Sequence, residues 1–169
     1  NLECNDNQIT NLAVIDIPNL TRLYASKNLI INLIINNSPK LTSIFIDENQ
    51  LNDFNLSRFP ELVQFNCSLN KLTSLDLSNN KKLQYLIISG NYWNKLVISD
   101  LPLLSSIDFV GINYYYDGIG NQINSLTLSN LPLLGVVYYP DNEELENLNL
   151  YKLNLGVPYF SKSKDPFRT

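Results

Sequence analysis

The sequence of 169 residues contains no histidine and no methionine. Without histidine, the chain lacks the commonest general base, the commonest metal ligand and the usual switch near neutral pH. It also lacks the phosphate-binding G-x-x-x-x-G-K-[ST] loop, the H-E-x-x-H zinc motif and the G-x-S-x-G nucleophile motif. We therefore expect a non-enzymatic protein, with no catalytic residues, no metal site and no cofactor.

Charge is also scarce, because charged residues make up 17% of the chain and the net charge is -4. The twelve lysines and arginines are scattered, which argues against binding to nucleic acid. No apolar run approaches the roughly 18 residues of a transmembrane helix, so we expect no membrane span in this segment. The chain begins at Asn1 without a signal peptide, which we interpret as a processed chain or a piece of a longer one.

The clearest pattern is an internal repeat with a period of about 21 residues, within the range of leucine-rich repeats. Each unit contains the motif L-x-x-L-x-L-x-x-N; in one unit Leu62 is followed by Phe65, Cys67 and Asn70. The leucines that open five successive motifs are Leu20, Leu41, Leu62, Leu83 and Leu104. Repetition of this motif at one fixed spacing is the signature of a leucine-rich repeat, in which each unit forms one coil of a solenoid.

The centre of each motif alternates inward and outward residues, as a short strand requires. One coil cannot bury its own apolar face, so stacked coils share a continuous core and a parallel sheet. We predict a leucine-rich repeat solenoid, a right-handed β-solenoid or horseshoe, with this sheet on the concave face. Because such a short coil leaves little room for an α-helix, the convex side should be extended chain, short strand or 3₁₀ turns. The motif asparagine should bond the backbone of its own coil and of the next.

The segment LVQFNCSLNKLTSLDLSNNKKLQYL resembles the repeats of bacterial surface leucine-rich proteins, especially the internalin J subgroup. That subgroup often has cysteine in the strand where leucine is usual, and Cys4 and Cys67 occupy this column here. The other coils carry Ala25, Ile46, Ile88, Phe109 and Tyr139 in the column. The resemblance covers roughly residues 1 to 155. It implies an extracellular or surface-attached bacterial binding protein, but it does not identify the ligand.

The two cysteines are predicted to be free, buried thiols. Cys4 and Cys67 lie three coils apart at the same inward position of the repeat. At roughly 4.8 Å per strand step, this separation is about 14 Å. A disulfide requires Cα atoms within about 7 Å, so the repeat register excludes a bond between them.

Outward-facing strand residues of a leucine-rich solenoid line its concave face. The large apolar side chains predicted to face outward are Tyr24, Phe45, Tyr85, Ile87 and Tyr138. Exposed aromatic residues are typical of interfaces, although cross-strand packing within the sheet would also account for them. Asp108 lies in the same column and belongs to a mildly acidic set with Glu3 and Asp47.

The register is interrupted after Phe109, and a smaller slip in the last coil places Leu145, Leu148 and Leu150 one residue late. The motif asparagine is due at position 112, where Ile112 stands, and the pattern resumes at Asn121. We interpret residues 112–120 as an insertion in a domain of about seven coils that spans residues 1–155. The insertion carries Tyr114, Tyr115 and Tyr116, which either contact a partner or cover a neighbouring coil. Residues 156–169 depart from the repeat and are predicted to form a C-terminal cap or a linker tail.

Two functions remain open at this point. The first is a protein-binding module of a bacterial surface protein, as part of an adhesin or as an accessory subunit of a larger envelope assembly. In the second, Tyr24, Tyr85 and Tyr138 stack on the sugar rings of a carbohydrate beside Asp and Asn side chains. The concave face and the tyrosine-rich insertion are the predicted contact surface in the first case.

Overall fold

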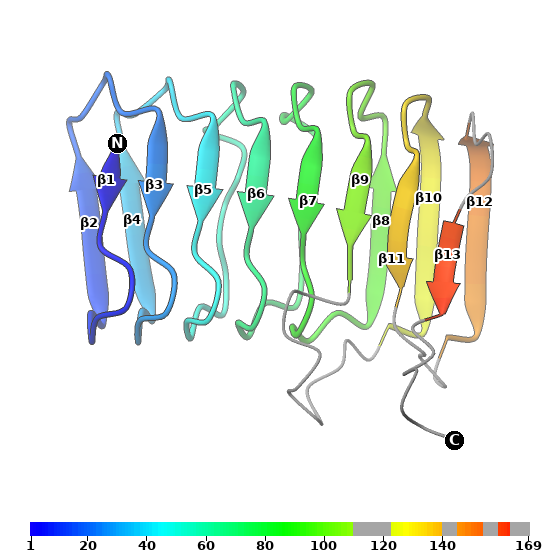
Figure 1. The fold of residues 1–169 in the computed structure, drawn as a ribbon, viewed down its shortest axis with the longest axis horizontal. Helices are drawn as coiled ribbons and strands as arrows, with labels where there is room; N and C mark the ends of the chain where they lie inside the picture. The colour runs from blue at the N-terminus through cyan, green and yellow to red at the C-terminus, as the bar shows by residue number, and fades with distance from the viewer. Residues whose placement is uncertain (110–122, 140–144, 154–158, 163–169) are drawn as a thin grey trace.

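The computed structural model describes residues 1–109, 123–139, 145–153 and 159–162, and of Tyr139 and residues 159–162 it describes the backbone alone. The chain forms a solenoid of stacked coils whose strands all pair in parallel (Figure 1). The described residues contain no α-helix and no 3₁₀ helix, so none of them forms a helix that could cross a membrane. The predicted fold class, a leucine-rich repeat solenoid, is confirmed.

An eight-stranded sheet, which we call the front sheet, runs the length of the solenoid. It corresponds to the sheet that the repeat predicts. Its strands in spatial order are β1 (Leu2–Glu3), β3 (Arg22–Tyr24), β5 (Ser43–Phe45), β6 (Gln64–Asn66), β7 (Tyr85–Ile87), β9 (Ser106–Asp108), β11 (Val136–Tyr139) and β13 (Tyr159–Lys162). We number coils 1 to 7 by the strands from β1 to β11. Leu2 pairs with Leu23 and Ile44 with Phe65, so equivalent residues of successive coils lie side by side.

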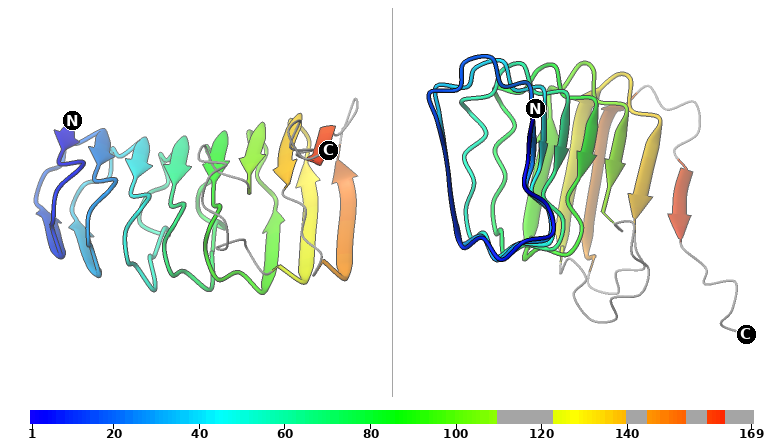
Figure 2. Two further views of the ribbon diagram at one scale, coloured as in Figure 1. Left: turned by 60° about the horizontal axis from the view of Figure 1, so that its bottom comes forward. Right: turned by 60° about the vertical axis from the view of Figure 1, so that its left-hand side comes forward.

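The opposite side of the solenoid carries two separate small sheets, which we call the back sheets (Figures 1 and 2). The first joins β2 (Asn11–Ile15) of coil 1 to β4 (Asn32–Asn36) of coil 2. The second joins β8 (Lys95–Ser99), β10 (Ser125–Leu131) and β12 (Asn147–Leu153) of coils 5, 6 and 7. Between the two back sheets, coils 3 and 4 pass through extended chain that pairs with neither sheet.

The interruption coincides with a change at one position of the repeat. Asn55 of coil 3 accepts the backbone N–H of Ser57 through its Oδ1 at 2.9 Å, and Asp76 of coil 4 accepts that of Ser78 at 2.9 Å. Such local side-chain bonds compete with the hydrogen bonds of a sheet. The coils that keep a back strand carry Ala13, Ile34, Val97, Thr127 and Asn149 at this position. Apart from Asn149, these side chains favour or tolerate a β-strand. They accept a hydrogen bond from a nearby backbone N–H weakly or not at all.

The core lies between the front and back walls and consists of columns of equivalent residues. The inward column of the front sheet is half-buried at Leu2 in the first coil and buried at Leu23, Ile44, Phe65, Leu86, Ile107 and Val137. Burial in a continuous stack stabilises each coil through its neighbours, as in other repeat proteins. The alternation predicted from the motif is therefore confirmed.

The motif asparagines form a buried ladder at the corner after each front strand. In coil 3, Asn49 Nδ2 donates to the carbonyls of Ala25 and Ile46 at 2.9 and 3.0 Å, and Asn49 Oδ1 accepts the Ile30 N–H at 2.9 Å. Asn28, Asn70 and Asn91 repeat this arrangement. Each asparagine thus bonds its own coil and the preceding coil, not the next one as the sequence suggested. The direction follows from the backbone, whose N–H groups at this corner point toward the following coil.

Both cysteines are free, as predicted. Cys67 is fully buried. Its burial raises the pKa of its thiol, and the nearby Asp47 carboxylate raises it further by repelling the thiolate. Cys4 is only half-buried because it lies in the first coil, and burial raises the pKa of its thiol as well. The column of cysteine positions is therefore an apolar part of the core.

Strand β13 falls within the segment that the sequence predicted as a cap or linker tail. It pairs in parallel with β11, with Val137 opposite Phe160, and so adds a strand to the front sheet. Residues 154–158 and 163–169 lie outside the described residues.

A candidate binding surface on the front sheet

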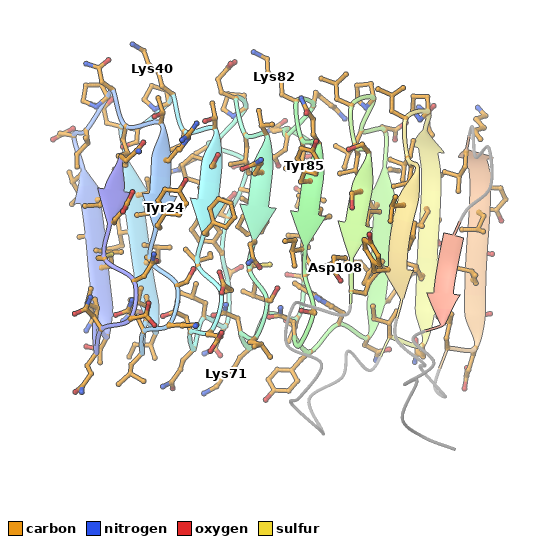
Figure 3. All side chains as sticks on the ribbon, in the orientation of Figure 1. Tyr24, Lys40, Lys71, Lys82, Tyr85 and Asp108 are labelled. Carbon is orange, nitrogen blue, oxygen red and sulfur yellow. The ribbon has the colours of Figure 1, made fainter. Side chains whose placement is uncertain are left out.

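The register of the front sheet places one residue of each strand in a single outward row. The row contains Glu3, Tyr24, Phe45, Asn66, Ile87, Asp108 and Tyr138. Tyr85 belongs to the adjacent outward row, opposite Gln64 and Ser106. Tyr24, Tyr85 and Asp108 lie on this face in Figure 3. The sheet thus brings together six of the residues predicted to bind a partner. The other three, Tyr114, Tyr115 and Tyr116, lie outside the described residues.

Tyr24 and Phe45 form a stacked pair on neighbouring strands. Their ring centroids are 5.2 Å apart, the ring planes differ by 16°, and both side chains are half-buried. Parallel strands bring equivalent residues to about this separation, and aromatic stacking stabilises the contact by about 1 kcal/mol. For this pair, packing between neighbouring strands is one reason why aromatic residues stand on the outward face.

Tyr85 and Tyr138 are more open than the stacked pair. Their side chains are 46% and 43% exposed, although β7 and β11 each have a neighbouring strand on both sides. Ile87 is half-buried and lies in the row between Asn66 and Asp108. Large apolar side chains that remain exposed on one face are a feature of interaction surfaces. The region of Tyr85, Ile87, Asp108 and Tyr138 is therefore the stronger part of the candidate surface.

Asn66 separates the two aromatic regions of the row. Its side chain is buried, and its Oδ1 accepts the backbone N–H of Ser68 at 3.0 Å and the Ser68 hydroxyl at 2.7 Å. These bonds turn the amide oxygen back onto its own strand end. From Tyr24 on β3 to Tyr138 on β11 there are five strand steps, which span about 24 Å. The surface is long enough for two separate contact regions.

Polar side chains continue along one side of the row. Asn5 Oδ1 accepts the backbone N–H of Ser26 at 2.8 Å, and the Ser26 hydroxyl donates to Asp47 Oδ1 at 2.6 Å. Lys40, Lys71 and Lys82 lie along the long edges of the solenoid (Figure 3). They bond Asn19, Gln50 and Glu61 there. On the front face, the carboxylates of Glu3, Asp47 and Asp108 outnumber the cation Arg22, which favours a partner with positive charge.

A second surface was not foreseen from the sequence. An open groove of about 500 Å³ crosses the outside of coils 1 to 3 on the back of the molecule. Its lining residues are Asn11, Leu12, Ala13, Ile31, Asn32, Leu33, Ile34, Asn52 and Asp53. The sequence feature that could have indicated this groove is the apolar composition of NLAVI and NLIIN, in which both faces of the strand carry apolar residues.

No group of three or more potential metal ligands occurs in the part of the chain that the structure describes.

The register, the buried columns and the asparagine ladder define the class of protein: a leucine-rich repeat solenoid. No protein-family model matches the chain, and no curated protein does either.

Among solved structures, the chain is similar to the functional domain of InlJ from Listeria monocytogenes, which includes a cysteine ladder. The two are 22% identical, with a TM-score of 0.38. The alignment covers 89% of this chain and 48% of that one, so the chain spans about half the length of the InlJ domain. At these values the likeness carries no argument about function, and the candidate surface rests on the geometry of this chain.

Proposed function

We propose that the chain is a non-enzymatic protein-binding module of an extracellular or surface-attached bacterial protein, and that it binds through the front sheet. The observation that carries the proposal is the exposure of Tyr85 and Tyr138 on one continuous sheet face. Rigid aromatic side chains supply large contact area at low conformational cost. An adhesin, or an accessory subunit of an envelope assembly, would use such a surface.

We include the three inserted tyrosines in the proposed surface. The insertion follows β9, the strand that carries Asp108, and Asp108 lies opposite Tyr138 in the sheet. A partner bound at Asp108 and Tyr138 would then reach Tyr114, Tyr115 and Tyr116. Deletion of residues 112–120 restores the regular spacing of the repeat. We expect the deletion variant to fold and to bind its partner more weakly; undiminished binding would limit the insertion to a covering role.

Site-specific photo-crosslinking tests the front sheet directly. The photoreactive residue p-benzoylphenylalanine is placed at Tyr85 in one variant and at Val97, which is 50% exposed on a back strand, in another. Both variants are irradiated with an extract of surface proteins from the source organism. We expect a discrete protein adduct from position 85. An excess of the native chain should suppress this adduct by competition, whereas the double variant Tyr85→Ser, Tyr138→Ser should suppress it poorly. Equal adducts from positions 85 and 97 would reject the front sheet as the binding surface.

A carbohydrate-binding surface is the second candidate. Exposed Tyr85 and Tyr138 could stack on sugar rings, with Asp108 as a hydrogen-bond acceptor for hydroxyl groups. The Tyr24–Phe45 stack weakens this alternative, because the facing sides of the two rings cover each other. A glycan array with the native chain and the Tyr85→Ser variant distinguishes the two candidates: sugar binding that is lost in the variant would replace the protein partner.

A further inference from the structure

The break in the back wall leaves the edge of β4 open. Strand β4 pairs with β2 on one side, and the described chain of coil 3 supplies no strand on the other. In Figure 1 the coils between β4 and β8 cross the back without a strand arrow. An open strand edge presents backbone N–H and C=O groups that can pair with another chain. Here the open edge lies inside the wall of a regular solenoid, at the position where the next strand is missing.

A core column is also incompletely covered in this half of the solenoid. Leu96 and Leu126 hold this column position in coils 5 and 6, where back strands continue, and they are 2% and 0% exposed. In coils 1 to 4 the equivalent side chains of Leu12, Leu33, Phe54 and Leu75 are only partly buried, although Leu12 and Leu33 stand on paired back strands. Covering this apolar area would stabilise a complex by about 25 cal/mol for each Å² removed from water.

The groove described above is lined by β2 and β4 and, beyond the open edge of β4, by Asn52 and Asp53 of coil 3. Ile31 and Ile34 of coil 2 are 50% and 51% exposed and supply its apolar wall. Asn32 Nδ2 donates to Asn11 Oδ1 at 2.8 Å, and Asn11 Nδ2 donates to Thr10 Oγ1 at 3.1 Å, so these two amides form a polar strip along the groove. Asp53 of coil 3 is exposed at the opposite side, and it is the one charged side chain among the described residues that line the groove. The groove therefore combines a strand edge, an apolar wall and a single negative charge.

These three features specify the chemistry of the occupant. A lipid or a small apolar ligand would cover Ile31 and Ile34 but leave the backbone groups of the β4 edge unpaired. Asp53 disfavours an anionic ligand and favours a cationic group. An extended peptide meets all three requirements, because its backbone pairs with the strand edge and its alternate side chains reach one face.

We propose that the β4 groove binds an extended peptide, which adds to β4 as a further strand. An apolar side chain of the peptide packs beside Ile34, and a Lys or Arg two residues away in sequence lies beside Asp53. The spacing of two residues follows from the alternation of side chains along a strand. The site is separate from the front sheet and does not depend on the function proposed for that surface.

Selection from a random library of displayed heptapeptides on the immobilised chain tests the proposal. We expect enrichment of peptides with alternating apolar residues and one Lys or Arg two positions from an apolar residue. The best peptide is then made with a fluorescent label, and its binding is followed by anisotropy. Ile34→Asn should weaken binding about tenfold, as for loss of one apolar anchor. Asp53→Asn should weaken it several-fold and reduce its dependence on salt.

Controls on both the protein and the peptide make the outcome decisive. Val97→Asn on the other back sheet and Tyr85→Ser on the front sheet should leave binding unchanged, since both residues are exposed and remote from the groove. N-methylation of alternate peptide amides should abolish binding, because strand addition requires those N–H groups. Hydrogen exchange should show protection of residues 32–36 on binding. No enrichment, or binding that survives both groove variants or responds to Tyr85→Ser instead, would overturn the proposal.

Discussion

Trp93 donates its indole N–H to the backbone carbonyl of Ile88 at 2.8 Å. In the four preceding coils, a branched aliphatic residue holds the position of Trp93, for example Leu72 in coil 4. The carbonyl that corresponds to Ile88 accepts the asparagine of the following coil, as Cys67 does from Asn91 at 2.9 Å. The larger, fully buried indole thus adds a donor to the ladder in the coil that precedes the insertion.

Replacing Trp93 with leucine should lower the free energy of unfolding by about 3 kcal/mol. The change leaves a cavity in the core and removes one buried hydrogen bond. Urea denaturation followed by circular dichroism measures the loss. Trp93→Phe is the matched control, because it keeps most of the volume and removes the N–H; its cost should be about half as large. Equal stability of the leucine variant and the native chain would contradict the role of Trp93.

Substitution of Asn49 by leucine should be among the most destabilising single changes. It removes the donors to Ala25 O and Ile46 O and the acceptor for the Ile30 N–H, and all of these groups are buried. Unpaired buried polar groups cost about 1–3 kcal/mol each. Asn7→Leu is the control, since Asn7 donates to carbonyls of its own coil and its side chain is exposed. If both variants lose the same stability, the ladder does not couple the coils.

The stability of the chain should fall at alkaline pH through Cys67. Burial raises the pKa of this thiol in the folded chain, so above its ordinary value near 9 the unfolded chain loses the proton first. The unfolded state then binds fewer protons, and the free energy of unfolding decreases by up to about 1.4 kcal/mol per pH unit. Denaturation at pH 8 and pH 10.5 measures the effect. The difference between the two values should be smaller in Cys67→Ala, whereas an identical difference would exclude the thiol.

Replacing Asn55 and Asp76 with valine should extend the back wall across coils 3 and 4. The change removes the side-chain acceptors for Ser57 and Ser78 and introduces residues that favour strands. Hydrogen exchange should then show slower exchange for residues 53–57 and 74–78. Asn52→Val is the control, because it alters an exposed residue of the same coil outside the turn. Unchanged exchange would mean that these side chains do not decide the break.

Truncation after Leu155 should lower the melting temperature. It removes β13, which pairs with β11 over four residues, and so opens the edge of the front sheet beside Val137. A loss of about 1 kcal/mol would shift the midpoint by a few degrees in a domain of this size. Truncation after Lys162 is the control, because it retains β13 and should melt as the full chain does. If both truncated chains melted equally early, residues 163–169 rather than β13 would supply the stability.

Much of the fold was predictable because the residue pattern that sets it is local and repeated. The spacing of Leu41, Ile44, Ile46 and Asn49 sets one strand and one corner, and recurrence of that spacing sets the register of the whole front sheet. The inward and outward assignment of each strand residue follows from the same spacing. The free state of Cys4 and Cys67 follows as well, because the register alone separates the two thiols.

The candidate site was predictable only in part. Sequence spacing places Tyr24, Phe45, Tyr85 and Tyr138 on one face, but it does not give the exposure of their side chains. Tyr24 and Phe45 stack on each other, whereas Tyr85 and Tyr138 remain open. Which aromatic residues cover each other depends on rotamers and on the neighbours in adjacent strands.

The sequence by itself determined the period, the columns of the core and the face on which the outward aromatics stand. These properties depend on residue spacing, which the backbone translates directly into position. The tertiary structure alone decided the broken back wall, the open edge of β4 and the groove beside Ile34. In the structure, Asn55 bonds its own turn, and such a local bond competes with pairing of the backbone to the neighbouring coil, which forms only when the coils are stacked.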